Sequence, residues 1–311
     1  MKAFISGLIL IAVSGGALLW YLATRSATLP QAGPERTARC MVWKAERGKA
    51  TVWLCGSFHL LSEADYPLPA PYWQAFTEAK LVVMETPRDP AAGAERQAKI
   101  TALGQLPAGE SLEQHLTPEV WAAVTKHCAA DGPPLATLQS MRPWMAAFHI
   151  TNHTMASLGY SSARGLESYF TAQAGTRTLS GLESLEEQFA GLTRLDAASQ
   201  ESMLLQIISD APHAAARMDD NIAAWREGDT RRLSALHDES MAGIPALKQF
   251  LFHDRHAAWL PKLEQYLDGP DPVMVLTGAL HLCGRGSLIE LLEAKGAKLT
   301  QMEYRTTRPA P

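Results

Sequence analysis

Two apolar segments near opposite ends of this 311-residue chain end in the same pattern. The run Thr-Val-Trp-Leu-Cys leads into Gly56-Ser-Phe-His59, and the run Val-Met-Val-Leu-Thr leads into Gly278-Ala-Leu-His281. Each run is short and rich in β-branched and other apolar residues, which predicts a buried strand. Glycine after a strand permits a sharp exit and a close approach of other groups. Because ligand sites in open α/β sheets lie beyond the carboxyl ends of strands, we expect His59 and His281 to meet at one edge of a sheet.

A third apolar run, Leu81-Val-Val-Met, ends on Glu85. If its strand runs parallel to the other two, the Glu85 carboxylate belongs to the same edge. In chain order, strands are predicted at residues 41–45, 50–55, 80–85, 176–182, 272–277 and 298–302, and helices at 70–79, 95–158 with a break at 132–134, 184 onward, 205–208, 218–225, 255–267 and 288–295. We therefore predict an α/β fold, in which a mixed sheet carries two strand–Gly-x-x-His motifs and a large helical insertion, preceded by an N-terminal transmembrane or signal helix.

The first 25 residues are expected to lie outside this fold. No charged residue occurs from Ala3 to Thr24, and about 20 apolar residues are enough for a helix to cross a membrane. The apolar stretch is longer than in most signal peptides, and no good Ala-x-Ala cleavage pattern follows it. We expect residues 1–25 to be a single-pass anchor that places the rest on the periplasmic or another extracytoplasmic side; a cleaved signal peptide is the alternative. Residues 26–39 then predict a flexible linker, 40–304 one domain, and 305–311 a tail.

The composition excludes one broad class of function. The chain is 47% hydrophobic and 19% charged, which is usual for a globular protein, and its formal net charge is −4. Nothing in this charge balance indicates nucleic-acid binding. The four cysteines, Cys40, Cys55, Cys128 and Cys283, are too few and too scattered for a disulfide scaffold. In an exported domain Cys55 could pair with Cys283, or one of them with Cys40; buried free thiols are the alternative.

The three strand-end residues indicate metal chemistry. Two imidazoles and a carboxylate are common ligands of a catalytic divalent metal ion, with positions left open for water or substrate. We expect His59, His281 and Glu85 to hold zinc, manganese or cobalt, with Glu85 as a ligand or as general base to the bound water. The alternative is that both histidines are hydrogen-bonded strand-end residues and that Glu85 caps a helix. A second pair, His149 and His153, would share one helix face, but no adjacent glutamate completes a protease motif.

Several short stretches, taken in order, resemble the TraB/GumN family, which is related to the Tiki membrane metalloproteases and to erythromycin-esterase/ChaN-like proteins. The stretches are Val42-Trp-Lys44, Gly56–His59, Tyr66–Pro69, Leu81–Glu85, Arg142-Pro-Trp144, Gly165-Leu-Glu167, Gly181–Gln188 and Gly278–Gly284. The resemblance implies that His59, His281 and Glu85 form a metal site and that Arg255 is the family arginine. Such an arginine would bind a substrate carboxylate or stabilise an oxyanion; a salt bridge from Arg255 to Glu85 or Glu183 is the alternative. His256 stands where the family more often has asparagine.

By analogy with Tiki proteins, the resemblance implies a metal-dependent hydrolase, and most simply a peptidase. The expected partners are a peptide or small-molecule substrate and the membrane. Two alternatives remain at this point, because a shared fold does not fix function. One is a non-catalytic module that binds a peptide pheromone or another small ligand at the same edge of the sheet. The other is a structural periplasmic factor with a vestigial site.

Overall fold

The structure is a computed structural model that describes residues 35–87, 92–241 and 245–307. The predicted membrane anchor at residues 1–25 lies outside these ranges. Within them, no helix combines the length and the apolar character that crossing a membrane requires.

The described residues form the predicted mixed sheet, with six strands in the order β4-β3-β5-β2-β1-β6. The strands are β1 (Arg36–Arg47), β2 (Ala50–Ser57), β3 (Leu81–Met84), β4 (Thr178–Gly181), β5 (Val273–Gly278) and β6 (Lys298–Thr306). β5 lies between β3 and β2 and is parallel to both, whereas β2 and β1 are antiparallel. Nearly every residue of β2 and β5 is buried, as is usual for strands covered on both faces.

The register of the parallel strands brings the three predicted exits to one edge. Ser57 pairs with Gly278, and Met84 pairs with Leu276, so the chain leaves β2, β5 and β3 at nearly the same level. The sequence-based prediction that the two Gly-x-x-His motifs and Glu85 follow parallel strands is therefore confirmed.

Helices make up most of the remaining chain. They are α2 (Ala70–Glu78), α3 (Gly93–Gly104), α4 (Pro118–Ala130), α5 (Leu135–Leu138), α6 (Pro143–Ser157), α7 (Leu166–Gln173), α8 (Leu185–Arg194), α9 (Ala197–Asp210), α10 (Ala214–Arg226), α11 (Thr230–Met241), α12 (Pro245–Lys248), α13 (Arg255–Asp268) and α14 (Leu288–Ala294). Local sequence explains several helix starts. Proline occupies the first turn of α4 and α6, and Ser184 caps α8 by accepting a hydrogen bond from the backbone N–H of Glu187.

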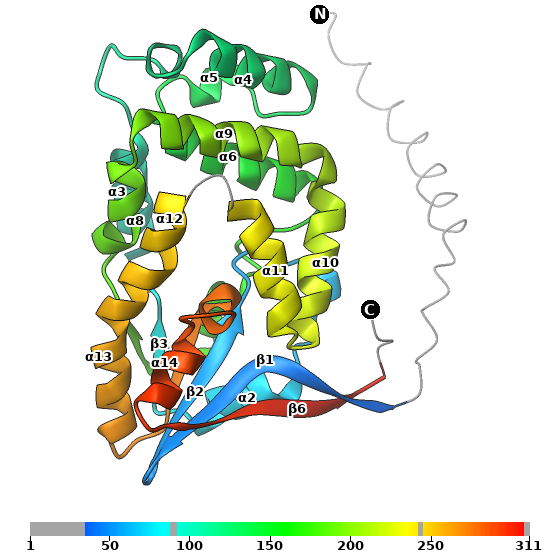
Figure 1. Ribbon diagram of the computed structural model, residues 1–311, viewed down its shortest axis with the longest axis vertical. Coiled ribbons are helices and arrows are strands. Elements are labelled where there is room, and N and C mark those ends of the chain that lie inside the picture. Colours follow the sequence, from blue (N-terminus) through cyan, green and yellow to red (C-terminus); the bar gives the residue numbers. More distant parts are fainter. Residues whose placement is uncertain (1–34, 88–91, 242–244, 308–311) are drawn as a thin grey trace, which may run out of the picture. The chain divides into compact units, whose positions relative to one another are not determined.

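The apolar side chains form two clusters. The first cluster surrounds the sheet and includes residues from α2, α7, α10, α13 and α14. The second cluster includes side chains from α4, α5, α6, α8, α9 and α12. Figure 1 shows α4 and α5 stacked on the pair formed by α6 and α9. The predicted helical insertion thus has a hydrophobic core of its own, to which α8 contributes Leu192 and Phe189.

Two strand boundaries differ from the expectations drawn from the sequence. β1 begins at Arg36, so residues 36–39 belong to a strand and not to the predicted linker. β6 continues to Thr306, which extends the sheet into the predicted tail. Of the alternatives left open for the cysteines, the structure has the free thiols: none of the pairings among Cys40, Cys55 and Cys283 is formed, and the thiol of Cys283 donates a hydrogen bond to the carbonyl of Ala279.

Candidate functional site

The exit of β2 is held against the start of α7. The backbone N–H of Leu166 donates to the carbonyl of Phe58, and Leu61 forms a bridge with Ser161. Gly165 passes so close to His59 that a Cβ at this position would lie 2.7 Å from the carbonyl carbon of His59. Only glycine allows this approach. As a result, Glu167 in the first turn of α7 lies beside His59.

Glu167 orients the first motif histidine. Its side chain is buried, and its Oε1 lies 2.8 Å from Nδ1 of His59 and also accepts a hydrogen bond from the hydroxyl of Ser57. The His59 side chain, by contrast, is 53% exposed. Because a carboxylate can only accept, the neutral His59 ring carries its proton on Nδ1, and Nε2 has the lone pair.

Glu85 is the buried acid of the site, with an exposed fraction of 5%. Its Oε2 accepts hydrogen bonds from Arg255 at 2.6 Å and from Gln188 at 3.0 Å, and its Oε1 accepts the backbone N–H of Gly278 at 2.7 Å. Burial by itself would raise the pKa of this carboxyl. The neighbouring guanidinium of Arg255, aided by the Gly278 N–H, instead holds the pKa of Glu85 well below its usual range, so the group is ionised at neutral pH.

Arg255 joins two carboxylates. It begins α13 directly after a π-helical segment, Gln249–Asp254, a distortion often found at functional sites. Its Nε and Nη2 donate to Glu183, and Nη2 also donates to Glu85. The guanidinium carbon lies 4.4 Å from the ring centroid of Trp259, whose N–H donates to Glu183. The alternative of a buried salt bridge is thus realised with both acids.

Burial also affects the second of these acids. It raises the pKa of Glu183 more than the hydrogen bonds from Arg255 lower it. Of the two carboxylates that contact Arg255, Glu85 is therefore the one that stays ionised to lower pH.

The second motif histidine, His281, is buried in a short helical turn that follows β5. Its Nδ1 lies 2.9 Å from Nε2 of His256, and its Nε2 lies 3.3 Å from Nη1 of Arg255 and 3.5 Å from Oε1 of Glu85. Burial lowers the pKa of His281 well below its usual value, so the ring is neutral.

The three residues predicted to bind a metal converge at Gly278. A Cβ on this glycine would lie 3.3 Å from Oε1 of Glu85, 3.5 Å from Cδ2 of His281 and 3.7 Å from Nε2 of His59. The structure therefore brings the predicted donors to one place at the sheet edge. His149 and His153, on α6, belong to the helical insertion instead.

The donor types fit a divalent ion, although the arrangement is not a finished metal site. The described ranges contain no group of three or more His, Cys, Asp or Glu side chains already placed to hold a metal ion. Arg255 faces His281 Nε2, the atom that would bind the metal. In favour of a metal, each histidine has its Nδ1 anchored, as ligand histidines usually do. The site residues also include three carboxyl groups, those of Glu85, Glu167 and Glu183, and a single guanidinium, that of Arg255; an excess of carboxyl groups favours the binding of a cation.

Four residues in this arrangement were not predicted as site residues: Glu167, Glu183, Gln188 and His256. Three of them lie in the stretches Gly165-Leu-Glu167 and Gly181–Gln188, which carried the family resemblance. Of these three, only Glu183 had an expected role, as a possible salt-bridge partner of Arg255. The signal for Glu167 is its position at the start of a helix that follows a glycine. His256 had only one signal, its substitution for the more usual asparagine.

The fold and site define an α/β protein in which two Gly-x-x-His motifs and an acid meet at the carboxyl edge of a mixed sheet. A model of the TraB/PrgY/gumN family matches residues 41–301, and the chain belongs to this family. The uncharacterized protein YbaP of Escherichia coli strain K12 is 26% identical over 274 residues, covering 81% of this chain and 96% of YbaP. YbaP of Shigella flexneri matches to the same extent. No solved structure matches the chain.

Proposed function

We propose that this chain is a metal-dependent hydrolase that acts on peptides, with His59, His281 and Glu85 holding a divalent ion such as zinc, manganese or cobalt. The observation that carries the proposal is the shared geometry of the two motif histidines. Each uses Nδ1 for a hydrogen bond within the protein. His281 Nε2 lies 3.5 Å from Oε1 of Glu85, and His59 Nε2 and the same Glu85 oxygen both lie within 4 Å of the position that a Cβ on Gly278 would take. Anchored Nδ1 atoms and convergent Nε2 atoms are the usual arrangement of histidines that bind a metal.

The residues supply the remaining chemistry. A bound divalent ion would acidify a water molecule and polarise a carbonyl group. Glu85 is ionised and faces the same point, so it is available as an anionic ligand or, in its alternative role, as the base that accepts a proton from the attacking water. Arg255 keeps Glu85 oriented, and its Nη1 is the guanidinium nitrogen that faces His281. Negative charge that develops on a substrate at this point would be stabilised by this nitrogen.

The proposed location follows the sequence. The apolar residues 1–25 would anchor the chain to the membrane and place the catalytic domain on the extracytoplasmic side, with a cleaved signal as the alternative. A peptide substrate would then reach His59, the most exposed of the proposed ligands, from the surrounding solution.

The test is metal content together with peptide cleavage by the purified full-length chain. Elemental analysis should find about one divalent ion per chain, and a panel of peptides should include a substrate. His59→Ala should abolish both properties, and it is the variant of choice because His59 is half exposed and its loss should cost little stability. His153→Ala is the matched control, since it removes a histidine of the competing pair on α6.

The alternative is a non-catalytic module that binds a peptide or another small ligand at the same edge. The contact between Arg255 and His281 Nε2 favours it, since a guanidinium next to a ligand atom opposes the binding of a cation. A wild-type chain that binds no metal but still binds peptide would establish this alternative. Metal and cleavage that survive unchanged in His59→Ala would overturn the proposed site.

A further inference from the structure

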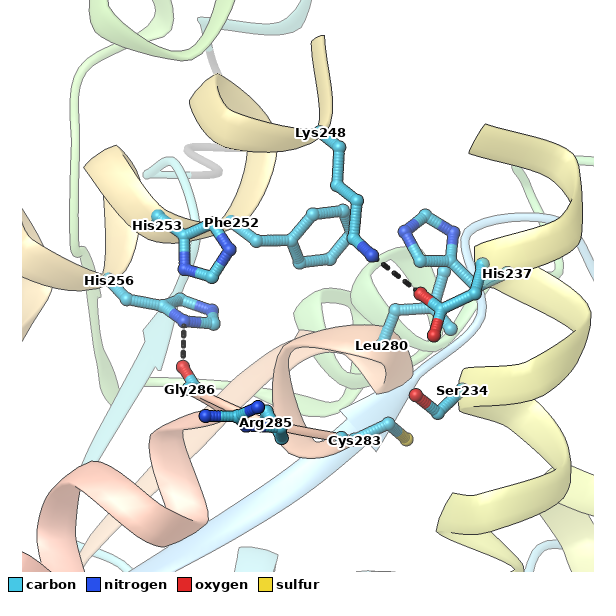
Figure 2. Close-up of a pocket in the computed structure, with 12 residues that line it drawn as sticks. Ser234, His237, Lys248, Phe252, His253, His256, Leu280, Cys283, Arg285 and Gly286 are labelled. Carbon is cyan, nitrogen blue, oxygen red and sulfur yellow. Dashed lines mark hydrogen bonds and ion pairs between the residues drawn. The ribbon is translucent and has the colours of Figure 1, made fainter. Parts of the chain in front are cut away.

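A chain of hydrogen bonds connects the loop before α14 to the buried histidine of the site. The carbonyl of Gly286 lies 2.8 Å from Nδ1 of His256, and Nε2 of His256 lies 2.9 Å from Nδ1 of His281. Figure 2 shows His256 pointing to the Gly286 carbonyl in the wall of a cavity of about 650 Å³, beside His253. His256 is 3% exposed and His281 is 5% exposed, so few water molecules can substitute for these bonds.

The hydrogen-bond partners determine which ring nitrogens of His256 and His281 carry a hydrogen. A backbone carbonyl only accepts, so Nδ1 of His256 must carry a hydrogen. The His256 ring is buried and its two nitrogens face a backbone carbonyl and a second imidazole, surroundings that disfavour a charged ring, so it holds a single proton and its Nε2 is an acceptor. The remaining bond therefore needs a donor on His281, which must be Nδ1–H.

The contacts of the other ring nitrogen of His281, Nε2, also place the proton of His281 on Nδ1. Nη1 of Arg255 lies 3.3 Å from Nε2 of His281, and a guanidinium nitrogen can only donate. Glu85 Oε1 is farther away, at 3.5 Å, and already accepts the N–H of Gly278 at 2.7 Å. Nε2 of His281 is thus the acceptor, and its lone pair faces Glu85 and Arg255.

We propose that His256 is a positioning residue that fixes the tautomer of His281, so that the Nε2 lone pair of His281 is presented to Glu85. His256 does for His281 what Glu167 does for His59, with one difference. A carboxylate beside His281 would compete with Glu85 and Glu183 for Arg255, whereas a neutral imidazole accepts the Nδ1–H without that competition. The importance of this tautomer for catalysis rests on the proposed function, but the tautomer itself does not.

The test is the protonation of the His281 ring nitrogens in the full-length chain. Nuclear magnetic resonance of 15N-labelled histidine distinguishes a protonated ring nitrogen from a bare one, and His281→Gln identifies the resonances by their loss. At neutral pH, with a chelator present, wild type should show a protonated Nδ1 and a bare Nε2. His256→Leu removes the acceptor and should shift His281 toward the form protonated on Nε2, which can donate to Glu85.

Two further variants separate positioning from general stability. His256→Gln should restore the wild-type tautomer, because the Gln amide oxygen can accept from Nδ1 at about the place of the imidazole Nε2. His253→Leu is the matched control: His253 lines the same cavity, is exposed, and makes no hydrogen bond among the residues that the structure describes. It should leave the tautomer unchanged. Loss of a partner that holds a ligand histidine typically lowers metal affinity or activity about 10- to 100-fold, and we expect that loss in His256→Leu and its recovery in His256→Gln.

Failure of the tautomer proposal can be distinguished from failure of the proposed hydrolase function. A wild-type His281 protonated on Nε2 would overturn the inference, as would an unchanged tautomer in His256→Leu. If His256→Leu does not fold, the wild-type spectrum and that of His256→Gln still decide. If the chain neither binds metal nor cleaves peptides, the proposed hydrolase fails while the tautomer assignment remains open to the same measurement.

Discussion

At the scale of single residues, the site combines a buried group that is ionised with buried groups that are neutral. Glu85 is held ionised by Arg255, while His256 and His281 are held neutral by burial. Each of these states was inaccessible from the sequence, because it depends on a partner that is distant in the chain: Arg255 is 170 residues from Glu85, and His281 is 25 residues from His256. The sequence could propose which residues take part, but not which nitrogen carries a proton.

The neutral histidines predict a loss of stability in mild acid. The pKa of His256 is about 4 in the folded chain and about 6.5 when unfolded. As the pH falls from about 6.5 to about 4, the unfolded chain takes up a proton that the folded chain does not, so the free energy of unfolding decreases, for His256 by up to about 3 kcal/mol. The pKa of Glu85 is lowered, so its stabilising contribution is lost only at more acidic pH, below its ordinary value of about 4.3.

Urea unfolding of the full-length chain between pH 7.5 and 4.5, with a chelator present, measures this effect. His256→Gln lacks one of the titrating histidine rings and should lose less stability than wild type over the same pH range. Equal losses in both proteins would show that His256 is not held neutral by the fold.

At the scale of elements, the exits of three parallel strands are positioned by close backbone approaches. The sequence allowed the strands themselves to be predicted, because β2, β3 and β5 are short apolar runs that end in glycine or an acid. The placement of β5 between β3 and β2 was not predictable, since apolar strands carry no code for their neighbours. The docking of α7 on the β2 exit was also missed, because it depends on the close approach of Gly165 to the backbone of His59, which leaves no room for a side chain at Gly165.

Gly165→Ala tests this docking. The new methyl group would overlap the backbone of His59 at its carbonyl, so the loop or α7 must move. We expect the free energy of unfolding to fall by about 1–3 kcal/mol, together with weaker metal binding as His59 separates from Glu167. Gly93→Ala is the control, because a Cβ on this first residue of α3 meets no atom within 4 Å.

Thermal denaturation followed by circular dichroism compares the two variants. The melting temperature of Gly93→Ala should equal or slightly exceed that of wild type, since alanine favours a helix. A Gly165→Ala protein as stable as wild type would mean that the contact between α7 and the β2 exit is not a constraint on the site.

At the scale of the whole described domain, the helical insertion is a separate hydrophobic unit that touches the site through α8. Gln188 on α8 donates to Glu85, while Leu192 and Phe189 on the same helix belong to the helical cluster. The mainly helical character of residues 95–158 and the break at residues 132–134 were predictable from periodicity, whereas the non-helical residues 105–111 and 139–142 were not. The role of α8 as a link between this cluster and the buried acid was not, because the capping box fixes only where that helix begins.

Trp144→Ala tests the independence of the two clusters. Trp144 is fully buried and its ring lies against Phe148 and Phe189, so we expect a loss of about 3–5 kcal/mol in the stability of the helical cluster. Hydrogen exchange should accelerate in α4, α6 and α9, while β5 and α13 keep their protection. Equal acceleration in the sheet would show that the two clusters unfold as one unit.

The central position of β5 has a consequence for synthesis on the ribosome. β2 and β3 emerge early, but the strand that lies between them is made more than 180 residues later, close to the last of the strands. Until then two apolar strand edges have no native neighbour and must be shielded by other means. A chain that ends before residue 273 therefore lacks both the middle strand of the sheet and His281.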